Sequence, residues 1–257
     1  MYSEWAPGHI GGESETIIGE WMKKRGNRDQ IIIATKVGKL DTKPGLKHSN
    51  IISACEDSLK RLGSDYIDIY YSHQDDLATP IEQTVETYDS LVKSGKVRYI
   101  AASNFTPEKL QESLDISKEL DLVSYIASQD QYNLMDRGYE NTLMPTVKSN
   151  SLSQIPFYGL ARGFLTGKYR KGKTVESIRA HGVNTSHAND RGWAMIERLD
   201  QIAKDKNTSI AAVALAWLRT QVTVAAPIAS ATKLEQIKEI MPIVELTSDE
   251  LQTLTNS

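Results

Sequence analysis

Polar side chains end four of the β-branched segments in this sequence, and their types are those used in acid–base chemistry. The four pairs are Thr35 and Lys36, Ser72 and His73, Ser103 and Asn104, and Ser128 and Gln129. The carboxyl ends of parallel strands meet at one rim, so in a parallel barrel these side chains converge. A cation such as Lys36 lowers the pKa of a nearby phenol, which makes Tyr2 a candidate general acid, with Tyr70 and Tyr71 as weaker candidates. A neutral His73 would then orient a carbonyl group.

Simpler interpretations exist for each of these residue types. A lysine at a strand end is commonly a solvated charge, a histidine there is commonly a hydrogen-bonded loop residue, and a Ser-Asn pair is an ordinary turn or helix cap. A buried lysine can also form a Schiff base with a carbonyl compound, as in aldolases. The agreement of four strand ends favours a functional rim over four separate coincidences.

The rest of the chain predicts repeated βα units. Short β-branched segments are expected to form strands at residues 30–36, 65–73, 96–104, 122–129, 151–159 and 222–230. Amphipathic or apolar segments are expected to form helices at residues 13–24, 48–62 and 208–219. Further helices are expected to start at Thr79–Pro80, at Thr106–Pro107 and at Thr247, where Glu250 has capping-box spacing. The irregular stretch 169–189 is long enough to bind something or to be disordered.

Six strands of this kind fit either an open doubly wound sheet or most of a (β/α)8 barrel. An open dinucleotide-binding sheet should carry G-x-G-x-x-G after its first strand, and the sequence has no such string. This favours an α/β fold of the TIM-barrel type. Because no linker or low-complexity tract interrupts the chain, residues 1–257 are expected to form a single domain.

Composition excludes several classes of function. The chain has 257 residues, of which 40% are hydrophobic, so it can bury a sizeable core. Its 30 Lys and Arg against 33 Asp and Glu leave a net charge of -3, which gives no global basic surface for nucleic acid. No apolar run is long enough for membrane insertion, and the first residues, MYSEWAPGHI, have neither the basic nor the apolar region of a signal peptide, so a cytoplasmic protein is expected. Cys55 is the single cysteine, so neither a disulfide nor a cysteine metal cluster is expected.

Eight strings along the chain resemble the aldo-keto reductase superfamily, in the order in which that family carries them. They are GGESETIIGEWMKK, IIIATKVG, DYIDIYYSHQDD, GKVRYIAASNF, SQDQYNLMDR, PFYGLARGFLTGKYR, ALAWLR and PIASATKLEQIKE. The resemblance is closest to the bacterial branch that also resembles potassium-channel β subunits, and it extends from Tyr2 to the C-terminus. It implies a (β/α)8 barrel that binds NADP(H) without a glycine-rich dinucleotide motif.

The resemblance also implies a role for individual residues. Tyr2 matches the general acid, Lys36 the lysine that lowers its pKa, and His73 the histidine that orients the carbonyl. The matches to cofactor contacts are Ser103, Asn104 and Gln129 for the nicotinamide carboxamide, Phe157 for ring stacking, Leu160 to Lys168 with Gly163 for the pyrophosphate, Lys168 and Arg179 for the phosphate that distinguishes NADPH, and Thr232, Gln236 and Glu239 for the adenosine ribose.

The sequence departs from the family pattern at its start. The family's catalytic tyrosine lies in a D-T-A-x-x-Y segment whose Asp ends the second barrel strand, whereas Tyr2 is the second residue here. The sequence thus resembles a family member that lacks its N-terminal portion, with the first two barrel strands absent. Unpaired strand edges are then expected, and with them self-association. Ile240 also stands where relatives often have Asn.

Three functions are compatible with these residues. The first is an NADPH-dependent oxidoreductase that reduces small-molecule aldehydes or ketones to alcohols, with Tyr2 as the general acid. The second is a non-catalytic NADP(H)-binding regulatory subunit that resembles a potassium-channel β subunit. The third is a Schiff-base lyase that uses Lys36, which leaves the string PFYGLARGFLTGKYR unexplained.

Overall fold

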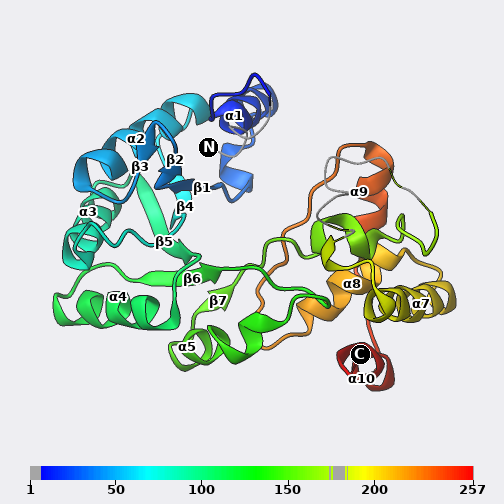
Figure 1. The fold of residues 1–257 in the computed structure, drawn as a ribbon. Coiled ribbons are helices and arrows are strands. Elements are labelled where there is room, and N and C mark those ends of the chain that lie inside the picture. Colours follow the sequence, from blue (N-terminus) through cyan, green and yellow to red (C-terminus); the bar gives the residue numbers. More distant parts are fainter. Residues whose placement is uncertain (1–6, 174, 176–182, 184, 257) are drawn as a thin grey trace. The chain divides into compact units, whose positions relative to one another are not determined.

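The chain forms two compact units, residues 1–128 and 129–257, which are described separately (Figure 1). The computed structural model describes residues 7–173, 175, 183 and 185–256. Two predicted site residues, Tyr2 and Arg179, therefore lie outside the described residues. The expectation of one domain over the whole chain stays a prediction.

A layer of parallel strands forms the centre of the first unit. Its strands are β1 (Ala34–Val37), β4 (Ile67–Ser72), β5 (Val97–Ser103) and β6 (Tyr125–Gln129), and they lie side by side in that order. Strands β1 and β5 both run parallel to β4. Helices α2 (His48–Leu62), α3 (Ile81–Lys93) and α4 (Pro107–Glu119) follow β1, β4 and β5 in sequence and cover one side of the sheet (Figure 1). We call this covered side the back face and the opposite side the front face.

Helix α1 (Glu13–Arg25) packs on α2 at a position where only glycine fits. A Cβ atom on Gly19 would lie 2.4 Å from the carbonyl oxygen of Arg61 and 2.8 Å from that of Leu62. Both distances are far inside van der Waals contact. The glycine therefore allows the backbone of α1 to approach the end of α2 directly.

The amino-terminal ends of the strands are held by two arginines that enclose Tyr66. The guanidinium carbons of Arg28 and Arg98 lie 3.8 and 3.9 Å from the centroid of the Tyr66 ring. Arg28, in the short helix η1 (Arg28–Gln30), also pairs with Asp68 at 2.7 Å, and Arg98 pairs with the same carboxylate at 2.8 Å. This cluster fixes the end of the sheet opposite to the predicted rim. A small hairpin of β2 (Lys39–Leu40) and β3 (Lys43–Pro44) follows β1.

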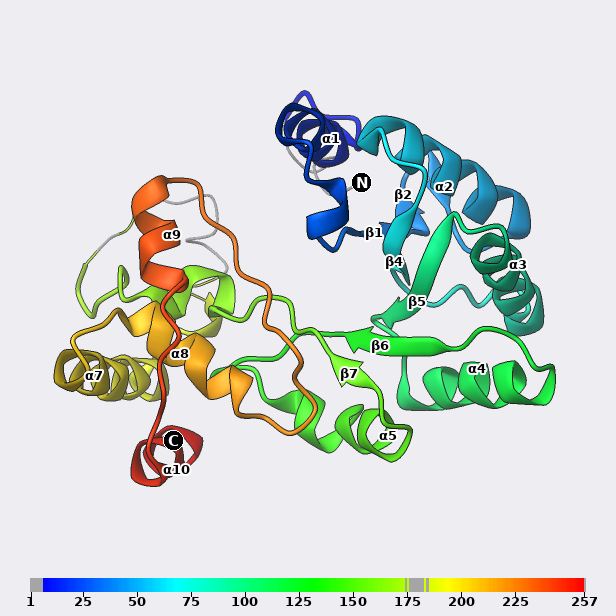
Figure 2. The same cartoon turned by 180° about the vertical axis from the view of Figure 1, so that it is seen from behind.

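The second unit is mainly helical. It contains η2 (Gly138–Asn141), α5 (Met144–Ser149), β7 (Ser153–Gln154), η3 (Ala161–Thr166), α7 (Asp190–Asp205), α8 (Ile210–Arg219), α9 (Leu234–Ile240) and α10 (Ser248–Thr255). Helix α8 is buried over nearly its whole length, and α7 lies beside it (Figure 2). The core of this unit is therefore built around α8.

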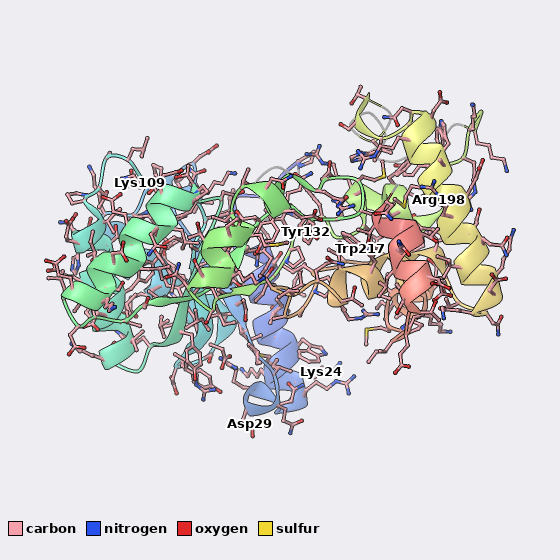
Figure 3. All side chains as sticks on the ribbon, turned by 90° about the horizontal axis from the view of Figure 1, so that it is seen from below. Lys24, Asp29, Lys109, Tyr132, Arg198 and Trp217 are labelled. Carbon is pink, nitrogen blue, oxygen red and sulfur yellow. The ribbon has the colours of Figure 1, made fainter. Side chains whose placement is uncertain are left out.

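Trp217 connects α8 to the last helix of the chain. Its Nε1 donates a hydrogen bond to Thr255 Oγ1 at 3.0 Å, and Arg137 donates to the carbonyl oxygen of Thr255. The rings of Tyr132 and Trp217, both labelled in Figure 3, have their centroids 5.6 Å apart. These contacts hold α10 against the core of the second unit.

The predicted helices at 13–24, 48–62 and 208–219 correspond to α1, α2 and α8, and the capping box of Thr247 and Glu250 begins α10. The predicted strand at 222–230 is wrong, because the structure has only a single bridge there, between Gln154 and Val224. Pro156 and Pro227 lie in the two adjacent segments and have no N–H group, which limits the ladder between them. Helix α7 was not predicted from the sequence.

The start of α4 offers a test of helix capping. Thr106 Oγ1 accepts a hydrogen bond from Lys109 N, whereas Thr79 donates to Asp76 and does not cap α3. We expect Thr106→Ala to lower the free energy of unfolding by about 1 kcal/mol, because one N–H group of the first turn loses its acceptor. Thr106→Ser should stay within a few tenths of a kcal/mol of the parent in urea unfolding. An equal loss in both variants would show that the Thr106 methyl group, and not the cap, is responsible.

Candidate active site

Lys36 and His73 share the front face of the sheet. Lys36 pairs in register with Tyr71, and Tyr71 pairs with Ala101. Side chains two residues apart on a strand lie on the same face, so His73 and Ser103 continue this face toward the rim. The Lys36 ammonium lies 4.9 Å from the centroid of the Tyr71 ring. The two residues predicted to tune a proton transfer are therefore neighbours within the first unit.

Burial changes the acid–base properties of Lys36. Its exposed fraction is 5%, and removal of the ammonium group from water lowers its pKa from 10.5 to about 7. The charged and neutral forms of this lysine therefore both exist near neutral pH. This is the property expected of a group that takes part in proton transfer.

His73 is held as a neutral imidazole. Burial is the main cause and the nearby charges of Lys36 and Lys39 add to it, so the pKa of His73 falls from 6.5 to about 3. The main-chain N–H of His73 donates to the carbonyl oxygen of Val37 at 2.8 Å, which ties the residue to β1. A neutral imidazole can donate one hydrogen bond to a carbonyl oxygen without protonating it.

Ser103 and Asn104 lie directly beside His73. Asn104 has a φ of 56°, in the left-handed region, and this turn brings its side chain back over the strand end. Its Nδ2 group donates to the carbonyl oxygen of His73 at 2.9 Å and to Ser103 Oγ at 3.0 Å. The first unit thus brings together Lys36, His73, Ser103 and Asn104, while Gln129 is buried at the end of β6.

The weaker acid candidates are separated by the sheet. Tyr71 lies on the front face under Lys36, whereas Tyr70 pairs with Thr35 on the back face. Burial raises the pKa of Tyr70 well above its ordinary value of 10. Tyr70 is therefore a core residue, and Tyr71 remains the alternative to Tyr2.

In the second unit, Phe157 leads into the predicted pyrophosphate loop. Its N–H group donates to the carbonyl oxygen of Asp130 at 3.2 Å, and it bridges Gln131. Its ring is half-buried and lies against Tyr158 with the centroids 5.1 Å apart. The main chain of Phe157, the residue predicted to stack on the nicotinamide ring, is thus held in place by the segment at residues 130–131.

The loop from Leu160 to Lys168 has an unusual backbone. Ala161, Arg162 and Gly163 all have positive φ values, of 47°, 57° and 97°. Phe164 is fully buried and packs on His187, Trp193 and Tyr169, so it is a packing residue. Leu160 and Leu165 are also buried.

Lys168 is the exposed cation of this loop. A Cβ atom built on Gly163 would lie 3.5 Å from the Lys168 Nζ, which shows how closely the ammonium group approaches the backbone. The ammonium also lies 5.2 Å from the centroid of the Tyr169 ring. The loop thus presents a positive charge beside a turn of its own main chain.

The predicted adenosine contacts lie at α9. The N–H and the hydroxyl of Thr232 both donate to Gln236 Oε1, at 2.8 and 3.2 Å. The Glu239 side chain is exposed, and its main-chain carbonyl accepts a hydrogen bond from Ser209. Thr232 and Gln236 are therefore hydrogen-bonded to each other, as their spacing of four residues indicates.

Sequence reasoning missed the groups behind the rim. Glu15 is buried and accepts a hydrogen bond from Thr35, the residue before Lys36. Tyr88 and Tyr125 are also buried, and both form hydrogen bonds with Ser72, the residue before His73. The only signal in the sequence is a hydroxyl residue immediately before each of the two rim residues. It does not reveal which distant side chains those hydroxyls meet.

Other features lie apart from these residues. A surface cavity of about 510 Å³ has Gly19, Arg28, Arg61 and Tyr66 among its lining residues, and none of the described candidate residues lines it. Within the part of the chain that the structure describes, no cluster of three His, Cys, Asp or Glu residues could hold a metal ion. In the same part, no helix has the length and apolar character needed to cross a membrane.

Comparison with known proteins identifies the family to which this chain belongs. The sequence profile of the Aldo/keto reductase family matches residues 6–257. The chain belongs to this family, a family of oxidoreductases, as the resemblance predicted. The family has a (β/α)8 barrel, and the α/β architecture with parallel strands agrees with it.

Individual relatives cover most of the chain. A protein of Oryza sativa subsp. japonica named "Probable voltage-gated potassium channel subunit beta" is 31% identical over 93% of this chain and 76% of its own length. The L-glyceraldehyde 3-phosphate reductase of Escherichia coli (strain K12) is 31% identical over 89% of this chain and 69% of its own length. An aldo-keto reductase of Bacillus subtilis (strain 168) is 35% identical over 84% of this chain and 66% of its own length. The chain is thus similar both to reductases and to a protein named as a channel subunit.

Proposed function

We propose that the protein is an NADPH-dependent reductase that converts small-molecule aldehydes or ketones to alcohols. The observation that carries this proposal is that Lys36 and His73 lie on the same face of the sheet. Burial gives Lys36 a pKa of about 7 and keeps His73 neutral. This combination suits the transfer of a proton to a carbonyl oxygen at neutral pH.

The residues present fit a nicotinamide cofactor. Asn104 is turned by its positive φ to lie beside Ser103 and His73, which suits recognition of a planar carboxamide, and Gln129 is the third candidate for that group. NADPH supplies a hydride ion when it is bound. In this proposal Phe157 stacks on the nicotinamide ring, the loop from Leu160 to Lys168 follows the pyrophosphate, and Thr232, Gln236 and Glu239 bind the adenosine ribose.

In this proposal the protein's own side chains supply the proton to the carbonyl oxygen. The Tyr2 hydroxyl donates its proton to the carbonyl oxygen as negative charge develops there. The positive charge of Lys36 stabilises the phenolate that remains, and the neutral His73 imidazole donates a hydrogen bond that orients the carbonyl. A cytoplasmic location and self-association stay predictions.

Reduction of benzaldehyde tests the proposal directly. Absorbance of NADPH should fall only when protein and aldehyde are both present, and benzyl alcohol should form in equal amount. NADPH binding seen by fluorescence titration, with no alcohol formed from a panel of aldehydes and ketones, would contradict the reductase proposal. That result would favour a non-catalytic NADP(H)-binding regulatory subunit, for which the similarity to a protein named as a channel subunit is the supporting observation.

Lys168 provides a test of cofactor preference. We expect Lys168→Ala to weaken NADPH binding by about tenfold or more, because a charge-assisted bond to the extra phosphate contributes at least about 1.4 kcal/mol. NADH binding should be nearly unchanged, since NADH has no such phosphate. Isothermal titration with each cofactor measures both effects. Arg179 is the second expected phosphate contact.

The matched control for this change is Lys173→Ala, which removes another exposed cation from the same segment. It should leave the affinities for both cofactors close to those of the parent. Equal weakening of NADPH and NADH by Lys168→Ala would assign the lysine to the shared part of the cofactor or to the loop structure. No weakening of either would remove Lys168 from the site.

A further inference from the structure

We propose that two buried hydroxyl groups on the back face of the sheet, those of Thr35 and Ser72, are positioning groups for Lys36 and His73. The proposal rests on the proposed function of the front face. Each hydroxyl belongs to the residue immediately before a rim residue, and each is fixed to the layer of helices. The side chain on one face of the strand would thereby set the orientation of the next side chain on the other face.

Ser72 is the centre of a cluster of three hydroxyl groups. Its Oγ atom lies 2.8 Å from Tyr88 Oη and 2.8 Å from Tyr125 Oη. All three side chains are at most 2% exposed, so water does not compete for these bonds. Tyr88 belongs to α3 and Tyr125 to β6, so the cluster joins β4 to two neighbouring elements just behind His73.

Thr35 is fixed by an ion pair whose carboxylate, that of Glu15, is buried. Its hydroxyl donates to Glu15 Oε1 at 2.5 Å, and Arg61 donates to Glu15 Oε2 at 2.6 Å. Glu15 is 4% exposed and belongs to α1, while Arg61 belongs to α2. The close approach of the two helices at Gly19 holds this pair in place behind β1. Two helices and one strand thus converge on the residue before Lys36.

The third strand of the row differs from the first two at the corresponding position. On β5 the residue before Ser103 is Ala102, which pairs in register with Ser72 and carries no polar group. Ser103 is expected only to bind cofactor, whereas Lys36 and His73 are expected to act on the proton. On β6, Ser128 precedes Gln129, so the positioning role of Thr35 and Ser72 rests on their bonds to Glu15 and Tyr88 in the helices, and not on the presence of a hydroxyl alone. Misplacement by about 1 Å can cost on the order of 10²-fold in rate.

Removal of each hydroxyl from the 257-residue protein tests the proposal. We expect Thr35→Val and Ser72→Ala each to lower kcat by about tenfold, within the effect of a small displacement of a catalytic group. KM for NADPH should change by less than threefold. Thr35→Ser restores the first hydroxyl and should restore kcat to within twofold of the parent. Tyr88→Phe removes only one bond of the Ser72 cluster and should give a smaller loss.

Ser117→Ala is the matched control. Ser117 is 2% exposed and its hydroxyl donates to the carbonyl oxygen of Ser113 at 2.8 Å within α4, so this variant also deletes a buried hydrogen bond of the first unit. It should lower thermal stability to a comparable extent and leave kcat unchanged. A loss of kcat in Ser117→Ala that matches the loss in Ser72→Ala would overturn the proposal, since stability alone would then explain the effect.

Two readouts on the cofactor-free protein separate this proposal from the proposed function. NMR of histidine-labelled protein, with the signal assigned through His73→Asn, should show the His73 imidazole shifted or broadened in Ser72→Ala and unchanged in Ser117→Ala. Acetylation of Lys36, followed by mass spectrometry, should be faster in Thr35→Val than in the parent. Unchanged His73 signals and an unchanged Lys36 rate would overturn the positioning role. Absence of aldehyde reduction by the parent, with both readouts as expected, would overturn only the reductase proposal.

Discussion

Lys36→Met is expected to lower aldehyde turnover by at least about 10²-fold, the lower end of the range that acid–base catalysis supplies. Methionine fills nearly the same space as lysine and packs well in a buried position, but it carries no charge to stabilise a phenolate. NADPH affinity should change little, because the cofactor contacts proposed above come from other residues. Initial rates at saturating NADPH measure the effect.

The same variant should be more stable than the parent at neutral pH. The pKa of Lys36 is about 7 in the folded protein and 10.5 in the unfolded chain, so between these values the unfolded chain binds a proton that the folded protein does not. The parent therefore gains stability as pH rises from about 7 to 10.5, by at most on the order of 5 kcal/mol. Lys36→Met has no group at this position that titrates, so its stability should not rise in this way between pH 7 and 10.5 and should already be at the higher level at pH 7.

Urea unfolding of both proteins at several pH values measures that difference. Lys36→Arg, which keeps a charge at all these pH values, is the control and should be less stable than Lys36→Met throughout. A Lys36→Met protein that turns over aldehyde at more than half the parent rate would show that Lys36 has only a structural role.

Tyr2→Phe is the second variant with a large expected effect. It removes the proposed proton donor and little volume, so turnover should fall by at least about 10²-fold while NADPH binding stays nearly unchanged. Stopped-flow measurement of NADPH oxidation together with a fluorescence titration gives both quantities.

Tyr71→Phe is the matched control, because the ring beneath Lys36 is kept and only its hydroxyl is lost. This variant should retain most of the parent activity. The opposite pattern, with Tyr71→Phe inactive and Tyr2→Phe active, would move the role of general acid from Tyr2 to Tyr71.

Much of the first unit could be predicted because its signals are local. The apolar spacing at residues 48–62 indicated the helix that became α2, and Thr106 followed by Pro107 marked the start of α4. The rim was also predictable, because Lys36 and His73 end consecutive parallel strands and such ends must meet. Local spacing and strand direction are sufficient for these features.

Other features depend on contacts between distant residues. Thr79 has the sequence of a helix cap, yet its hydroxyl donates to Asp76, a competing acceptor that the sequence does not reveal. Glu15 lies in a surface-type helix pattern but is buried against Thr35, 20 residues away. Such choices are made by tertiary packing, which a single sequence does not encode in its spacing.

The fit of Gly19 against the end of α2 has a consequence for how this protein can change over generations. No side chain can be added at position 19 unless the backbone around Arg61 moves. Arg61 in turn binds the Glu15 carboxylate, which accepts the hydrogen bond from the Thr35 hydroxyl. A substitution there would have to be accompanied by changes in a second helix to be tolerated. Trp21, two positions along and 43% exposed, carries no such constraint. Natural variation within this one helix should therefore be concentrated on its outer side, with position 19 fixed as glycine among descendants that keep the site.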